Sequence, residues 1–143
     1  MTEEEISGLL GGQTKLQMAT VNRDGTPHLV TMFYGLDDKG RIAFWTYRSS
    51  QKARNLERDP RITCLVETGV DYFELRGLML YGSVTTLTDP NDVRHVGSLV
   101  VRRMMNLEDD DAVAQFVEHT AAKRWAYIVE PSRIVSWDHR KLT

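Results

Sequence analysis

The sequence predicts a mainly antiparallel β protein with helices at its periphery, folded as one domain over residues 1–143. Turn sequences such as Asn22–Gly25 and Asp37–Gly40 separate short segments with strand character, which favours strands joined by tight turns. Helical segments interrupt these strands without alternating with them, which argues against a parallel βαβ array. Gly77 and Gly82 stand inside the longest predicted strand and indicate the bends that a closed or partly closed barrel needs.

Two short helices are predicted in the first half of the chain. Thr2 followed by Glu5 forms a capping box, and the two glycines at positions 11 and 12 end that helix. Residues 48–58 hold good helix formers behind a serine cap. This second helix ends before Pro60, because the residue that precedes a proline avoids the helical region.

Two further helices and the strands complete the expected order of elements. Pro90 suits the first position of a helix, and the acidic residues 109–111 open a shorter helix that is expected to turn Phe116 inward. Segments with strand character occupy residues 16–21, 28–36, 41–47, 61–67, 72–87, 124–130 and 133–137, the last two separated by Pro131.

Composition gives the chain the profile of an ordinary soluble protein, with 41% apolar and 27% charged residues. The net charge of −2 gives no reason to expect a nucleic acid or an acidic membrane as partner. No apolar run approaches the ~20 residues that a membrane-spanning helix needs, and the acidic start does not resemble a signal peptide. The single cysteine, Cys64, excludes an intramolecular disulfide and suits a reducing compartment, so we expect a cytoplasmic location.

A basic segment over residues 47–61 carries the clearest functional signal. Arg48, Lys52 and Arg54 gather at a helix start that is capped by serine. Such a start presents unpaired N–H groups and a partial positive charge, which suit a phosphate. The same pattern is also typical of an ordinary solvated basic helix, and the residues alone leave both interpretations open.

Four stretches of the chain resemble a known superfamily. They are MATVNRDGTPHLVTMFY, SSQKARNLERDPRITCLVE, LRGLMLYGSVTTL and SWDHRKL, and they extend from about residue 16 to the C-terminus. Together they resemble the pyridoxamine 5′-phosphate oxidase-like split-barrel flavin and deazaflavin oxidoreductases, and in particular the actinobacterial F420-dependent reductases. The resemblance implies a six-stranded antiparallel split β-barrel with peripheral helices. It also implies a homodimer with cofactor sites between the protomers.

The resemblance also implies positions for a cofactor. Its phosphate is expected at Lys52 and the hydroxyl-rich turn formed by Ser49 and Ser50, with Arg48 and Arg54 as further cations. The ring system is expected against the second and third strands, where it would meet Thr31, Met32, Phe33 and Tyr34. Trp137, in the SWDHRKL tail, is expected either to help form the pocket or only to tie the dimer together.

The function implied by the resemblance is an F420H2-dependent reductase that transfers hydride to a small organic acceptor. No acid–base constellation and no metal-ligand spacing stands out in the sequence, which suits an enzyme whose cofactor supplies the chemistry. The first alternative is an FMN-binding oxidoreductase of the same fold. The second is a non-catalytic protein that binds a flavin or deazaflavin. Fold and cofactor do not fix the substrate.

Aromatic residues give a separate reason to expect a dimer. The predicted strands carry more large aromatic side chains than one small barrel interior needs, and strand alternation sends some of them outward. A twofold interface would cover such a surface on both chains. The residues concerned are Phe33, Phe44, Trp45, Tyr72, Phe73, Trp125 and Trp137.

Overall fold

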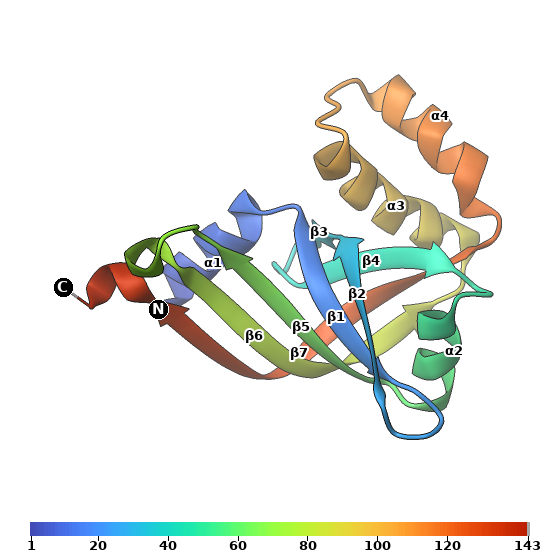
Figure 1. The fold of residues 1–143 in the computed structure, drawn as a ribbon. Helices are drawn as coiled ribbons and strands as arrows, with labels where there is room; N and C mark the ends of the chain where they lie inside the picture. Colours follow the sequence, from blue (N-terminus) through green and yellow to red (C-terminus); the bar gives the residue numbers. More distant parts are fainter. Residues whose placement is uncertain (143) are drawn as a thin grey trace.

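The computed structural model describes residues 1–142 as one curled antiparallel sheet with helices around it (Figure 1). The sheet has seven strands in the order β2-β1-β5-β6-β7-β4-β3. The strands are β1 Lys15–Val21, β2 Pro27–Phe33, β3 Gly35–Leu36, β4 Ile42–Tyr47, β5 Arg61–Thr68, β6 Arg76–Leu87 and β7 Arg124–Asp138. The α-helices are α1 Glu3–Gly12, α2 Gln51–Arg58, α3 Pro90–Met104 and α4 Asp110–Ala121, with short 3-10 turns at Tyr72–Glu74 and His139–Lys141.

The prediction of six strands is wrong, because the expected strand 28–36 divides at Tyr34. Its first part, β2, pairs with β1 at one edge of the sheet, and its second part, β3, pairs with β4 at the other edge. Only Tyr34 separates the two parts along the chain. Since one residue joins opposite edges, the sheet must curl until those edges meet. The result is a barrel that is closed at Tyr34 and split along the remainder of β2 and β4.

The two last predicted strands, 124–130 and 133–137, form one continuous strand instead. β7 passes through Pro131 and pairs with β6 along nearly its whole length. The register shifts between Tyr81 and Gly82, opposite Pro131, and this bulge lets the proline stand in the strand without breaking the ladder. A Cβ atom at Gly82 would lie 2.2 Å from the carbonyl oxygen of Glu130. The expected bend at Gly82 is confirmed.

Two apolar clusters hold the fold together. The first fills the barrel and includes Phe44 and Tyr127, whose rings stack with centroids 4.9 Å apart. Burial raises the pKa of the Cys64 thiol in this cluster to about 12, so it is a packing residue. The second lies outside the barrel wall, where α3 and α4 pack on β4 and β7. Trp45 belongs to the second cluster and lies against Gly97 of α3, where an added Cβ would be 2.5 Å from the indole.

Helix α2 is fixed to the barrel by the buried amide of Asn55. This amide donates to Thr20 Oγ1 at 3.0 Å and to Asn22 Oδ1 at 2.9 Å, and its oxygen accepts from Gln51 at 2.9 Å. The serine cap is confirmed, because Ser50 Oγ accepts a hydrogen bond from the backbone N–H of Ala53. The basic segment therefore starts from a defined position above the end of β1.

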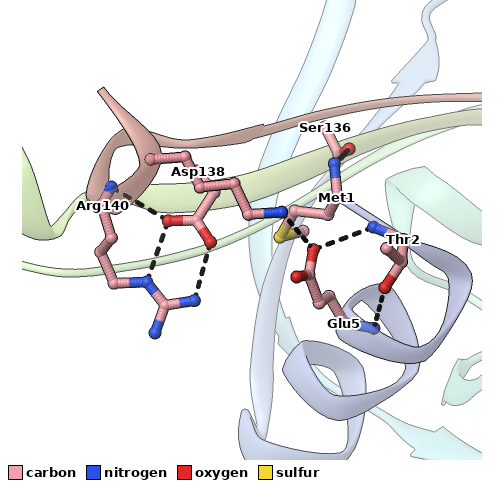
Figure 2. A network of polar contacts seen from close by, with 7 residues as sticks. Met1, Thr2, Glu5, Ser136, Asp138 and Arg140 are labelled. Carbon is pink, nitrogen blue, oxygen red and sulfur yellow. Dashed lines mark hydrogen bonds and ion pairs between the residues drawn. The ribbon is translucent and has the colours of Figure 1, made fainter. Parts of the chain in front are cut away.

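The two chain ends meet at the far end of the barrel from α2 (Figure 1). Figure 2 shows the polar network that joins them. The backbone nitrogen of Met1 donates to Ser136 Oγ at 3.0 Å, and Lys141 pairs with Glu5 at 2.9 Å. The predicted capping box between Thr2 and Glu5 is present, so Glu5 serves both the helix and the tail.

The outer face of the sheet carries exposed apolar side chains. Leu29 is 66% exposed on β2 and Tyr81 is 36% exposed on β6. Between them in the register lie Ala19 on β1 and Thr63 on β5, which are half-buried. Phe33 also faces solvent, whereas Phe44 and Trp45 are buried. The expectation that alternation sends some of these aromatic side chains outward is confirmed, because Phe33, Tyr72 and Phe73 are exposed. No helix within residues 1–142 is both long and apolar enough to cross a membrane.

We expect Asn55→Ala to lower the free energy of unfolding by about 1–3 kcal/mol, because it removes the hydrogen bonds to the buried Thr20 hydroxyl on β1 and to Asn22 in the turn that follows. Chemical denaturation followed by circular dichroism measures this change. Arg54→Ala, on the exposed side of the same helix, is the control and should change stability by less than about 0.5 kcal/mol. Equal effects of the two substitutions would contradict the role given to Asn55.

Candidate functional site

A groove of about 390 Å³ lies at the split in the barrel. One side is the edge strand β2, and the others are β4, the start of β7 and the two helices α3 and α4. Figure 1 shows this helix pair standing above the open edge of the barrel. The lining residues are mostly apolar or aromatic: Thr31, Met32, Phe33, Trp45, Tyr47, Val100, Met104, Phe116, Thr120 and Arg124.

Three of the four residues predicted to meet a ring system line this groove. Thr31, Met32 and Phe33 stand on β2, which presents alternate side chains to the two sides of the sheet. Tyr34 differs, because its side chain is fully buried and its hydroxyl donates to the carbonyl oxygen of Leu10 at 2.6 Å. Burial raises the pKa of Tyr34. Its side chain therefore belongs to the barrel closure, and only its backbone lies beside the groove residues.

The helix pair supplies groove residues that the sequence pattern placed elsewhere. Phe116 was expected to face inward on its helix, but it is 37% exposed and lines the groove. Val113 and Val117, which were expected to face inward together with Phe116, do fill the inward positions of α4. Met104, at the end of α3, lies on the same side of the groove. Helical periodicity identifies an apolar face, but it does not separate residues that fill a core from residues that line an open groove.

Arg124 is the residue that the sequence interpretation missed. It begins β7 and pairs with Tyr47 of β4 in the sheet register. Its guanidinium lies 4.1 Å from the ring centre of Tyr47 and 4.6 Å from that of Trp45. The Nε atom is buried and has no hydrogen-bond partner within the described chain. Because it stacks on two aromatic faces and one of its donors has no partner within residues 1–142, Arg124 is a candidate ligand-binding residue.

Lys52, the residue predicted to bind the cofactor phosphate, is partly buried on α2. Its pKa is lowered, first by burial and then by the positive charge of Arg124. The two cations are thus close enough to repel each other, and within residues 1–142 neither forms an ion pair with a carboxylate. A bound anion between or beside them would offset both the repulsion and the cost of burial.

The other residues of the predicted phosphate site occupy different surroundings. Ser50 Oγ accepts from the Ala53 N–H and from Thr46 Oγ1, so its own proton is available for a ligand. Arg48 donates to the carbonyl oxygen of Ala122 at 3.1 Å, on the side of the helix pair. Ser49 and Arg54 have exposed side chains. The structure thus brings Lys52, Ser50 and Arg48 to one end of β4.

Trp137 lies away from the groove of its own protomer. It stands near the far end of β7 from Arg124 and packs over Gly77, where a Cβ would lie 2.6 Å from the indole. Asp138, next in the chain, accepts from Arg140, and this interaction holds the pKa of its carboxyl far below the usual range. The tail is therefore well fixed, and Trp137 does not line the groove of its own chain. Within residues 1–142, no group of three His, Cys, Asp or Glu side chains is arranged to hold a metal ion.

Comparison with known proteins identifies the family. The model of the pyridoxamine 5′-phosphate oxidase family matches residues 2–138. The chain belongs to this family. The predicted resemblance to the split-barrel flavin and deazaflavin superfamily is thereby confirmed. The comparison with curated proteins gave no match.

Solved structures of the superfamily include one of high similarity. The conserved hypothetical protein Rv2991 from Mycobacterium tuberculosis is 37% identical, with a TM-score of 0.93 over 99% of this chain and 88% of that one. A protein described as an F420 reductase is 22% identical, with a TM-score of 0.73 over 94% of this chain and 98% of that one. The heme storage protein HutZ from Vibrio cholerae is 16% identical, with a TM-score of 0.72 over 93% and 92%. The last two share the fold.

The groove suits the flavin-type cofactors that this family binds. Its apolar and aromatic lining fits a flat ring system, and the unpartnered donor of Arg124 beside Lys52 fits an anionic group. A cofactor whose ring lies in the groove and whose phosphate lies beside Lys52 and Arg124, the basic end of the groove, would use both the apolar lining and the cations.

We expect Arg124→Gln to raise the pKa of Lys52 toward its ordinary value, because the substitution removes a neighbouring like charge. Burial is the larger cause of the lowering, so the recovery should be partial. NMR titration of the Lys52 side chain measures the change. Arg54→Gln is the matched control, and a Lys52 pKa that responds equally to both substitutions would contradict the placement of Arg124.

Proposed function

We propose that the protein is an F420H2-dependent reductase that transfers hydride to a small organic acceptor. One observation carries this proposal: an apolar groove at the barrel split lies near Lys52 and Arg124, two partly buried cations that form no ion pair within residues 1–142. The similarity in fold to a protein described as an F420 reductase supports the choice of cofactor. The sequence motifs that resemble the actinobacterial reductases support it further.

The residues of the groove have distinct tasks in this proposal. Lys52 and Ser50, with Arg48 nearby, would hold the phosphate of the cofactor by charge-assisted hydrogen bonds. Thr31, Met32 and Phe33 would support the ring along the edge of β2. When bound, the reduced deazaflavin supplies the hydride, while the apolar walls orient the acceptor and exclude water. Solvent or a nearby hydroxyl would complete protonation of the acceptor.

Two other functions fit parts of the same structure. An FMN-binding oxidoreductase would use the same groove and basic end, and the family binds flavin-type cofactors. A non-catalytic binder is favoured by the similarity in fold to a heme storage protein, since that neighbour shows the fold serving storage. We propose a cytoplasmic location, which would keep the thiol of Cys64 and a reduced cofactor in their reduced forms.

We also propose a homodimer with composite sites. The outer face of the sheet that carries the exposed side chains of Leu29 and Tyr81 would lie against a second copy, and obligate interfaces of this kind often exceed about 2,000 Å². In such a dimer, the partner's Trp137 would lie at the groove of the first chain. The Trp137 of the first chain lies away from that groove.

We expect F420 to bind at least tenfold more tightly than FMN, a difference of about 1.4 kcal/mol. Separate fluorescence titrations of the purified protein with the two cofactors measure this ratio. Equal or tighter binding of FMN would favour the flavin alternative, and bound F420 without turnover of any acceptor would favour the non-catalytic binder.

Lys52→Ala should weaken cofactor binding by roughly 1–3 kcal/mol through loss of a charge-assisted hydrogen bond. The melting temperature without cofactor should change little. Lys39→Ala removes an exposed lysine from a turn away from the groove and serves as the control. Unchanged affinity in Lys52→Ala would show that the phosphate binds elsewhere.

Trp137→Ala should weaken the dimer and cofactor binding together, because the proposed composite site draws on the tail of the partner. Sedimentation at low micromolar concentration and cofactor titration measure the two effects. Val70→Ala, at a position that is 91% exposed, is the control. A stable 16.4 kDa monomer with full cofactor affinity would refute the composite site.

A further inference from the structure

The groove lining holds three hydroxyl groups, which belong to Thr31, Tyr47 and Thr120. Within residues 1–142, the only ionisable side chains of this lining are those of Tyr47 and Arg124. An arginine keeps its proton in proteins, and a threonine hydroxyl is a much weaker acid than a phenol. Tyr47 is therefore the residue of the groove lining whose side chain can release a proton and take it back.

The position of Tyr47 suits such a role. It is the last residue of β4, and its side chain is 47% exposed. The sheet register places it opposite Arg124 of β7, whose guanidinium lies 4.1 Å from the centre of the phenol ring. This contact holds the ring in place. The guanidinium also stabilises the negative charge that remains on the phenol oxygen once its proton has left.

A second cavity, of about 240 Å³, adjoins the groove at Tyr47. Tyr47 and Thr120 line both spaces, and the exposed residues His119 and Lys123 line only the second. Within residues 1–142, no carboxylate lines either space. Because exposed residues form the second cavity, water enters it and can replace a proton that Tyr47 gives up.

The other two hydroxyl groups are less suited to proton transfer. Thr31 Oγ1 accepts a hydrogen bond from Gln17 Nε2 at 3.4 Å. Thr120 Oγ1 is buried and has no hydrogen-bond partner within the described chain, so water does not reach it. A general acid needs both a route to the reacting atom and a supply of replacement protons.

We propose that Tyr47 is a catalytic residue that protonates the acceptor during its reduction, an inference that rests on the proposed function. The step is written for an alkene conjugated to a carbonyl group. A hydride, with its two electrons, forms a C–H bond at the alkene carbon farther from the carbonyl, which leaves an enolate. The O–H bond of Tyr47 then breaks, and its proton forms a C–H bond at the carbon next to the carbonyl. Solvent returns a proton to the phenolate.

Reduction of 2-methylcyclohexenone with F420H2 in D2O tests this role, because the carbon next to the carbonyl becomes a stereocentre that receives its hydrogen from the proton donor. The wild-type protein should place deuterium there in one configuration, as measured by NMR and chiral chromatography. Tyr47→Phe should bind F420H2 with unchanged affinity, reduce the enone at least tenfold more slowly and give both configurations. Tyr72→Phe removes an exposed tyrosine hydroxyl outside the groove lining, and it should behave as the wild type does.

The configuration of the product decides the outcome. One retained configuration in Tyr47→Phe, at whatever rate, would overturn the inference. Loss of the single configuration in Thr120→Val but not in Tyr47→Phe would also overturn it and assign the proton to Thr120. A wild-type protein that binds F420H2 but gives both configurations, or leaves the enone unreduced, would contradict the role of Tyr47 alone. A protein that binds no F420H2 would refute the proposed function and the inference with it.

Discussion

The passage of the chain across Tyr34 is the constraint on which the rest of the structure depends. One residue joins the two edges of a seven-stranded sheet, so the sheet has to curl into a barrel. The hydroxyl of Tyr34 bonds to Leu10, and the guanidinium of Arg103 lies 4.7 Å from its ring centre, which together fix the closure. Because the barrel closes there, the adjoining part of β2 stays unpaired on one side and faces the groove.

Local chemistry explains what the sequence predicted correctly. The cap at Ser50 and the capping box at Thr2 each depend on residues close together in the chain, and each is present. The bend at Gly82 is also present, and the glycine itself marked it, although the strand that it meets there is distant in the sequence. The same locality explains the error at Tyr34, because a run such as 28–36 carries no signal that its two parts join opposite sheet edges. The strand count depends on long-range pairing, which periodicity does not encode.

The residues of the candidate site also divide into those that sequence motifs indicate and those that depend on long-range pairing. Lys52 and residues 31–33 were identified from motifs, and they lie near or line the groove. Arg124 was not identified, because its importance arises from the register that places it beside Tyr47 and from the fold that places it beside Lys52. A lone arginine at the start of a predicted strand gives no such indication. Lys52 and Arg124 indicate an anion site only when two facts are combined. Both side chains are partly buried, and within residues 1–142 neither forms an ion pair with a carboxylate.

The separation of the two apolar clusters has a consequence for how such a protein can change over evolutionary time. The barrel interior is filled by one cluster, whereas α3 and α4 are held by the other, outside the barrel wall. Substitutions at Met104 or Phe116 reshape the groove without touching the interior that keeps the barrel folded. Substitutions in this helical hairpin can therefore reshape the groove while its strand edge and the cations beside it stay as they are.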